Sequence, residues 1–175
     1  MLMNERQAAA IEAQIPSLRR YARALTGSVD RADDLVQDCL ERAIARFAQF
    51  QPGTDLRAWL FTILHNVNCD QGRRRSRRGP EIPLEDCDHQ LRIPPRQNQR
   101  LELRDFARAF RSLSTDHQRI LLLAGVEGFS CEETARILGV AVGTVKSRLS
   151  RARENLRLAQ TRGDRPQQAS VGRAA

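Results

Sequence analysis

Apolar residues recur at helical spacing in two blocks of the chain. The spacing i, i+3, i+4, i+7 occurs in the first block at Leu18, Tyr21, Ala22 and Leu25, and a similar stripe occurs in the second at Leu103, Phe106, Ala107 and Phe110. This period is typical of helices with one buried face. Between the blocks, Leu84 to Gln99 has few, unpatterned apolar residues and two adjacent prolines. The pattern predicts an all-α protein with two small helical domains joined by a flexible linker.

Length and composition agree with this class. The 175 residues allow one ordinary domain or two small ones. Apolar residues make up 41% and aromatic residues 5%, which suits small helical units better than a β-sandwich or barrel. No run of apolar residues is long enough for a transmembrane helix. The N-terminal residues lack the apolar region of a signal peptide, so we expect none.

The net charge of +8 indicates a polyanionic partner, for which nucleic acid is the best candidate. All but one of the basic residues are arginine, so a GC-rich genome is an alternative source of the excess. The charge is segregated, however: five arginines lie within 73–78, and five basic residues against one glutamate lie within 146–157. The basic charge is therefore concentrated in two separate segments of the chain.

The cysteines give no sign of a metal or cofactor site. Cys39, Cys69, Cys87 and Cys131 lie far apart, and we expect reduced thiols. Cys87 with His89, or His65 with Cys69, could be half of a metal site, but zinc needs about four ligands. We expect neither a metal nor a cofactor.

Helix ends can be placed in the first block. Gly27 fits the end of one helix, and Pro16 fits its first turn or a break before it. Asp30 is the expected N-cap of the second helix. Its buried stripe is predicted at Leu35, Cys39, Ala43 and Phe47, helped by Val36, Leu40 and Ile44. A third helix is expected from about Asp55, with an apolar face at Leu56, Trp59, Leu60, Ile63, Leu64 and Val67.

Residues 130–153 have the form of a helix-turn-helix. The second block has two predicted helix starts. A cap at Ser114 or Thr115 begins one helix. Ser130 and Glu133 form a capping-box pattern at the start of the short helix of the motif. Gly139 breaks that helix, and the last helix is predicted from about Val142 to Leu158. Its core side should be Val145, Leu149, Ala152 and Leu156.

The opposite side of that last helix carries the candidate DNA contacts. They are Thr144, Ser147, Arg148 and Arg151, with Lys146 beside them, and Gly143 would let the helix start approach a phosphate. A plain helical hairpin with a solvated basic face is the alternative.

Several runs carry a resemblance to bacterial sigma factors of the extracytoplasmic-function (ECF) group. Their C-terminal DNA-binding domain resembles VGTVKSRLSRARENL and the preceding EGFSCEETARILG. Their polymerase-binding helix resembles DRADDLVQDCLERAIARF, and their −10 helix resembles LRAWLFTILHNVNCDQGRRR. The resemblance spans about Ile15 to Leu158. Two segments, QPGTDLRAWLFTIL and the run from EGFS to SRAR, further resemble the EcfG type, the general stress-response sigma factors.

The resemblance implies a domain plan and partners. Sigma region 2 would occupy residues 8–78, a linker 79–99, the region 4 helix-turn-helix 100–160 and a disordered tail 161–175. The chain would bind the beta-prime clamp and beta flap of core RNA polymerase as a monomer within the holoenzyme. It would start transcription from promoters in the cytoplasm, under a NepR-like anti-sigma factor, and it would not be an enzyme by itself.

The resemblance also assigns residues. An acidic, polar face is implied for polymerase binding: Asp33, Asp34, Gln37, Asp38 and Glu41. Without the family, a solvated helix face is the simpler interpretation. Asn66 matches a −10 base-recognition position, and backbone contacts are implied for Arg57, His65, Arg73 and Arg74. Trp59 could stack on a base, but its period favours the core. At the start of the last helix, Ala141 replaces the Ser or Thr cap of many relatives.

Two other functions compete with this one. A sigma mimic would bind and titrate an anti-sigma factor, as adaptors of the PhyR type do, although the chain has no room for their receiver domain. A small basic hydrolase or nuclease would need paired carboxylates, and those present (Asp33/Asp34, Glu132/Glu133) lie at helix starts where capping explains them. No catalytic constellation can be identified in the sequence.

Overall fold

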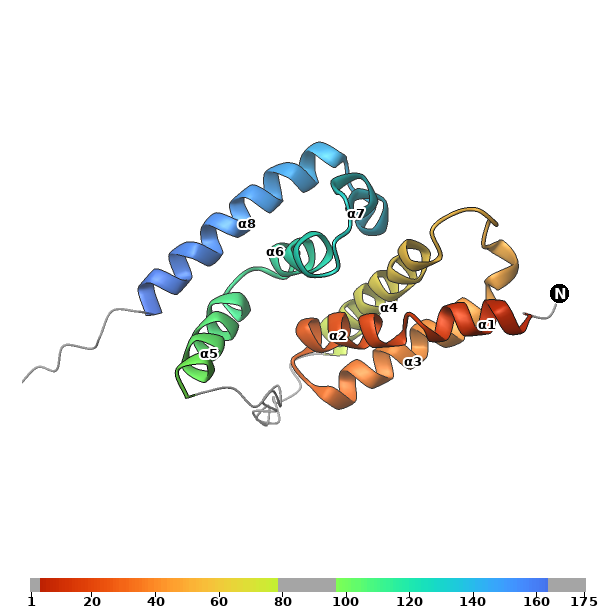
Figure 1. The fold of residues 1–175 in the computed structure, drawn as a ribbon, viewed down its shortest axis with the longest axis horizontal. Helices are drawn as coiled ribbons and strands as arrows, with labels where there is room; N and C mark the ends of the chain where they lie inside the picture. The colour runs from red at the N-terminus through yellow and green to blue at the C-terminus, as the bar shows by residue number, and fades with distance from the viewer. Residues whose placement is uncertain (1–3, 79–96, 164–175) are drawn as a thin grey trace, which may run out of the picture.

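The computed structural model describes residues 4–78 and 97–163, which form helices joined by short turns, without a strand in these ranges (Figure 1). The elements are α1 (Glu5–Glu12), α2 (Ile15–Thr26), α3 (Val29–Ala45), the 3₁₀ turn η1 (Phe47–Gln49), α4 (Leu56–Arg78), α5 (Gln97–Arg111), α6 (Thr115–Ile120), the π-helical turn η2 (Leu121–Val126), α7 (Cys131–Leu138) and α8 (Val142–Gly163). The all-α, two-domain prediction is confirmed. No helix in the described ranges is both long and apolar enough to span a membrane.

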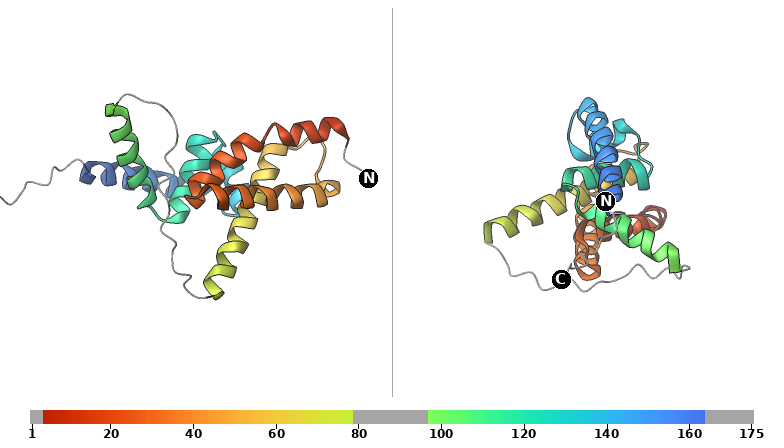
Figure 2. Two further views of the ribbon diagram at one scale, coloured as in Figure 1. Left: turned by 90° about the horizontal axis from the view of Figure 1, so that it is seen from below. Right: turned by 90° about the vertical axis from the view of Figure 1, so that its left-hand side faces the viewer.

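The first domain is built from α1 to α4. Helix α2 packs on α3 and α3 packs on α4, and the predicted stripe of α3 is fully buried at Leu35, Cys39 and Ala43. Burial raises the pKa of the Cys39 thiol to about 12, so this thiol stays protonated. Figure 2 shows that the C-terminal part of α4 projects away from the other helices.

Three details of the first domain differ from the sequence-based expectation. The N-cap of α3 is Ser28, in extended conformation with its hydroxyl accepting from the Arg31 N–H, and Asp30 already lies in the first turn. Ile44 is 55% exposed because it follows the buried Ala43 and is turned about 100° from it. Helix α1 has its own capping box between Asn4 and Gln7, and no helix was expected there.

The second domain is built from α5 to α8. The cap at Ser114 is confirmed, and Ile120, Leu122 and Leu123 are buried. Leu103 and Phe106 of the predicted α5 stripe are 40% and 42% exposed, because α5 packs mainly against α8 and buries Ala109 instead. The ends of this domain also shift: α5 begins at Gln97, inside the expected linker, and α8 continues to Gly163.

The helix-turn-helix is formed as the sequence predicts. The Ser130 hydroxyl accepts from the Glu133 N–H, and the Ser130 N–H donates to the Glu133 carboxylate at 2.8 Å, which lowers the pKa of that carboxyl. Gly139 ends α7 in the left-handed region with φ of 66°. Val145, Leu149 and Ala152 of α8 are buried, and Leu156 is partly buried. The opposite side of α8 is thereby turned outward.

We expect Ser130→Ala to lower the free energy of unfolding by about 1 kcal/mol, because the first N–H groups of α7 lose their cap. Ser130→Thr should recover most of this loss, since its hydroxyl accepts the same bond. Urea unfolding followed by circular dichroism measures both. Equal losses for the two variants would show that the cap does not stabilise α7.

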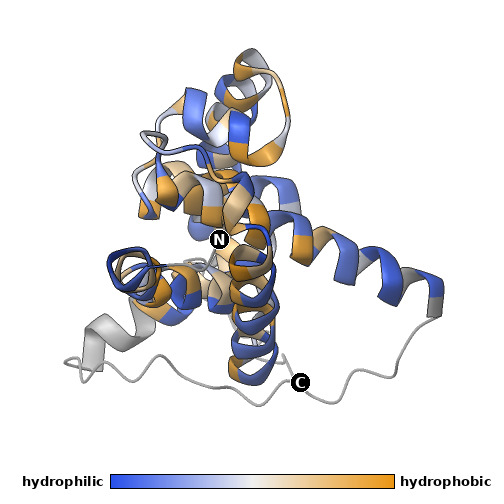
Figure 3. Cartoon of the chain, turned by 90° about the vertical axis from the view of Figure 1, so that its right-hand side faces the viewer, coloured by the Kyte–Doolittle hydropathy of each residue, from blue (hydrophilic) through white to orange (hydrophobic). Residues whose placement is uncertain are grey.

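The two domains share one apolar core. Leu122, Leu123, Phe129 and Ile137 of the second domain join the cluster formed by α1 to α4. Helix α4 lies against α7, and α2 contacts α6. Figure 3 shows hydrophobic and hydrophilic residues interleaved along the helices, as expected of helices with one buried face. The sequence predicted two tethered domains but not this contact. The predicted linker up to residue 96 and the tail beyond 163 lie outside the described residues.

Candidate nucleic-acid interface

The outward side of α8 presents the predicted donors together. Gly143, Lys146, Ser147 and Arg151 are exposed, and Thr144 and Arg148 are partly exposed. The Arg148 guanidinium donates to the Asp116 carboxylate of α6 at 2.9 Å. This bond positions the guanidinium. Arg148 must release the Asp116 carboxylate before it can donate to a base edge.

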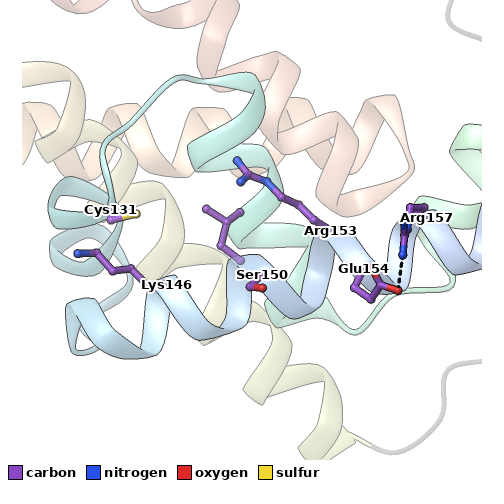
Figure 4. A pocket seen from close by; sticks show the side chains of 7 residues that line it. Cys131, Lys146, Ser150, Arg153, Glu154 and Arg157 are labelled. Atoms are coloured by element: carbon purple, nitrogen blue, oxygen red, sulfur yellow. Dashed lines mark hydrogen bonds and ion pairs between the residues drawn. The ribbon is translucent and has the colours of Figure 1, made fainter.

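A second basic edge of α8 begins at Lys146, and its other residues were not among the predicted contacts. A hollow of about 580 Å³ is lined by Cys131, Lys146, Leu149, Ser150, Arg153, Glu154 and Arg157. Figure 4 shows Lys146, Ser150 and Arg153 along α8, and Arg157 turned to Glu154, whose carboxylate accepts its hydrogen bond at 2.9 Å. The signal for this edge is in the sequence, because positions 146, 150, 153 and 157 follow helical spacing.

The start of α8 has no side-chain cap. The N–H groups of Thr144 and Val145 both donate to the backbone carbonyl of Ala141, at 2.9 and 3.1 Å. The alanine side chain has no oxygen for the remaining first-turn donors. Exposed Gly143 lies beside them, so a phosphate could approach this helix end closely.

Helix α4 keeps three of the predicted −10 contacts accessible. Asn66, Arg73 and Arg74 are exposed. Asp70 partly balances this surface, since it pairs with Arg42 at 3.2 Å and with Arg73 at 3.8 Å. The amide and the two guanidinium groups form the chemistry expected for base and backbone contact with a single strand.

His65 lies at the contact between the domains. Its Nε2 is 3.5 Å from the Cys69 sulfur, and its Nδ1 is buried without a hydrogen-bond partner among the described residues. Burial, together with the nearby Arg119 cation, lowers its pKa to about 4, although Asp116 acts in the opposite direction. His65 is therefore neutral at pH 7 and supplies no cation for a phosphate in this arrangement.

We expect acid to destabilise the protein through His65. Between the unfolded pKa of 6.5 and the folded pKa of about 4, the unfolded chain takes up a proton that the folded chain does not, so stability falls as the pH drops through this window. From pH 7 to pH 5 the loss should be about 1 kcal/mol, discounted for the partial exposure of the ring. Urea unfolding at both pH values, compared with His65→Gln, measures it. An equal loss in both proteins would contradict the assignment to His65.

Arg57 differs most from its predicted place. It was expected to contact the DNA backbone, but its Nη2 donates to the carboxylate and to the backbone carbonyl of Glu127, at 2.7 and 2.8 Å. Its guanidinium carbon lies 4.4 Å from the centre of the Phe129 ring. In this conformation, residues of the second domain bind the Arg57 guanidinium.

Trp59 belongs to an aromatic cluster at the edge of the core. Its ring lies 5.3 Å from Phe50 and 6.2 Å from Phe47, between ring centres, and it is partly buried. The prediction of a packing role is confirmed, because Trp59 packs against the buried cluster of the first domain.

The acidic face of α3 is present and partly tied down. Asp34, Gln37 and Glu41 are exposed. Asp33 pairs with Arg19 at 3.3 Å, and the Asp38 carboxylate accepts from the Gln71 amide at 3.0 Å. The exposed residues of this face therefore present negative charge to a basic partner, while Asp33 and Asp38 are bound to α2 and α4.

The described part of the chain holds no cluster of three potential metal ligands. Cys39, Cys69 and Cys131 are free thiols. Of the two half-sites considered, His65 and Cys69 lie side by side without a third ligand, and Cys87 with His89 lies outside the described residues.

Comparison with known proteins gives a consistent result for both domains. Residues 11–65 match the family described as the Sigma2 domain of PhyR, and residues 103–156 match sigma-70, region 4. The chain is 47% identical over 150 residues to the ECF RNA polymerase sigma factor EcfG of Rhodopseudomonas palustris, covering 83% of this chain and 80% of that protein. It is 34% identical to SigM of Mycobacterium tuberculosis, covering 79% and 69%.

Two solved structures share this arrangement of helices. The sigma factor RpoE of Bartonella quintana, solved in complex with the anti-sigma factor NepR, is 40% identical with a TM-score of 0.74, covering 90% of this chain and 98% of that one. CnrH, solved with the cytosolic domain of CnrY, is 28% identical with a TM-score of 0.67, covering 92% and 91%.

Proposed function

The chain belongs to the ECF RNA polymerase sigma factors, and on that premise we propose that it directs core RNA polymerase to promoters with −35 and −10 elements, including those of stress-response genes. The observation that carries this proposal is the geometry of α8. Its apolar side is buried in the second domain, and its outward side presents a continuous set of exposed or partly exposed donors.

The −35 element is assigned to α8. Lys and Arg side chains bond guanine edges or phosphates, and Ser and Thr hydroxyls serve either. The proposed contacts are Gly143, Thr144, Lys146, Ser147, Arg148 and Arg151. Phosphates of the same site would extend over Ser150 and Arg153, which line the neighbouring hollow.

The −10 element is assigned to α4. Asn66 offers an amide that can read a base edge, and Arg73 and Arg74 offer cations for the backbone of an unpaired strand. Arg57 can join them only after it leaves Glu127. His65 remains a proposed contact, through hydrogen bonding and not through charge.

Two protein partners follow from the same premise. The exposed acidic face of α3 fits a basic surface on the clamp of the polymerase. The second partner is a NepR-like anti-sigma factor, since the similar sigma factor RpoE of Bartonella quintana forms a complex with NepR. On this chain such a factor would bind across both domains and cover the polymerase surface.

A sigma mimic is the second candidate, because residues 11–65 match the family of the Sigma2 domain of PhyR. A mimic would bind an anti-sigma factor without directing transcription. The two functions share a fold and differ in whether the basic faces of α4 and α8 meet DNA.

Reconstituted run-off transcription tests the proposal. Core RNA polymerase is incubated with a library of promoter fragments, with and without the purified protein. A promoter-specific transcript that depends on the protein supports a sigma factor. Binding to an anti-sigma protein without any dependent transcript would favour the mimic instead.

A further inference from the structure

A buried carboxylate joins the two domains. Glu127 follows η2, and its side chain is 0% exposed. Its Oε1 accepts from Arg20 Nε at 2.9 Å and its Oε2 accepts from Arg20 Nη2 at 2.7 Å, so the Arg20 pair is bidentate. Arg57 Nη2 donates to the same Oε2 at 2.7 Å. Both arginines come from the first domain, from α2 and α4.

The backbone around Glu127 is shaped for this contact. The Glu127 N–H donates to the Leu122 carbonyl at 2.8 Å, which closes the π-helical turn. Gly128 follows with φ of 73°, and this left-handed turn brings Phe129 back under the domain contact. We call Glu127, Gly128 and Phe129 the docking corner.

The docking corner also makes apolar contacts with the first domain. Phe129 is 4% exposed, and its ring centre lies 5.0 Å from that of Phe61 in an edge-to-face arrangement. The Arg57 guanidinium lies over both rings, 4.4 Å from Phe129 and 5.4 Å from Phe61. One arginine thus makes charged, backbone and ring contacts at a single corner of the other domain.

From this geometry we propose that the docking corner holds the free protein closed and withholds Arg57 from nucleic acid until the domains separate. A buried carboxylate is tolerated only with its partners in place, so Glu127 favours the docked state as long as Arg20 and Arg57 hold it. Separation hydrates Glu127 and releases the guanidinium. After separation, Arg57 can therefore bind a phosphate of the nucleic acid in place of the Glu127 carboxylate.

The proposal goes beyond transcription itself, and its test uses the free, full-length protein. Small-angle X-ray scattering measures whether the molecule is compact. Fluorescence anisotropy with a labelled oligothymidylate of about twelve nucleotides measures access to the basic surface without any promoter sequence. A negative run-off assay would leave both measurements unaffected, so failure of the proposed function and failure of this inference are distinguishable.

Glu127→Ala should increase the radius of gyration and tighten oligothymidylate binding by at least about fivefold, because the competent open state becomes more populated. Glu132→Ala is the matched control: it removes the same charge from the exposed start of α7 and should keep the wild-type scattering curve with a smaller gain in affinity. Adding Arg57→Ala to Glu127→Ala should remove most of the affinity for oligothymidylate that Glu127→Ala gains beyond Glu132→Ala.

Arg20→Ala opens the contact from the other domain and serves if Glu127→Ala fails to fold. Compact scattering and wild-type affinity in both Glu127→Ala and Arg20→Ala would overturn the proposal. So would equal affinity gains in Glu127→Ala and Glu132→Ala, or wild-type scattering that does not fit the closed arrangement.

Discussion

Phe61→Ala is expected to lower the free energy of unfolding by about 3–5 kcal/mol, the usual cost of emptying a buried aromatic site. Phe61 is 0% exposed and lies between Tyr21 and Phe129, with ring centres 5.3 and 5.0 Å away. Its removal leaves a cavity in the first domain and takes away the ring against which the second domain packs. The loss should therefore weaken both the α1 to α4 core and the contact between domains.

Phe106→Ala is the matched control for that experiment. Phe106 is 42% exposed, and its ring centre lies 6.4 Å from that of Phe110. Its loss should cost at most about 1.5 kcal/mol, the value of one aromatic pair. Urea unfolding followed by circular dichroism compares the two variants. Similar losses would mean that Phe61 does not support the shared core.

The local rules of helix ends and periodicity were sufficient for the helix-turn-helix. Ser130, Glu133 and Gly139 determine its first helix through bonds that span three or four residues, and the spacing of Val145, Leu149 and Ala152 determines the buried side of α8. Because those side chains face the core, the outward donors follow automatically. This part of the candidate site could be predicted from sequence.

The same rules were insufficient at one helix end and on one helix face. Ser28 caps α3 in an extended conformation, although Asp30, two residues later, is an equally good capping residue by type. Leu103 and Phe106 fit a buried stripe, but α5 has one main neighbour and covers only part of it. Periodicity indicates which residues share a face, and it does not indicate how much of that face another element covers.

The place of Arg57 could not be predicted from any local pattern. Its partner Glu127 is 70 residues away, and the partnership of Arg20 with Glu127 spans 107 residues. A single sequence contains no signal for a pair of charges at such separations. The family resemblance suggested a DNA contact for Arg57, and the fold shows an internal partner for the same guanidinium.

We expect Arg148→Ala to weaken binding of the holoenzyme to a promoter by about 1–3 kcal/mol, if Arg148 reads a base edge. The side chain is partly exposed on α8 and is held by Asp116 at 2.9 Å. That bond holds the guanidinium near the outward side of α8, so on binding DNA the guanidinium would donate to a base edge instead of to Asp116. A contact with phosphate alone would cost less and would fade at high salt.

The measurement uses reconstituted holoenzyme, a promoter duplex that supports run-off transcription and a duplex with a scrambled −35 element. Arg148→Ala should reduce affinity for the promoter and leave affinity for the scrambled duplex nearly unchanged, at both low and high salt. Arg104→Ala, which removes an exposed charge from α5, should weaken both duplexes slightly and equally. Parallel losses on both duplexes for Arg148→Ala would restrict that side chain to phosphate contact, and an unchanged promoter affinity would remove it from the interface.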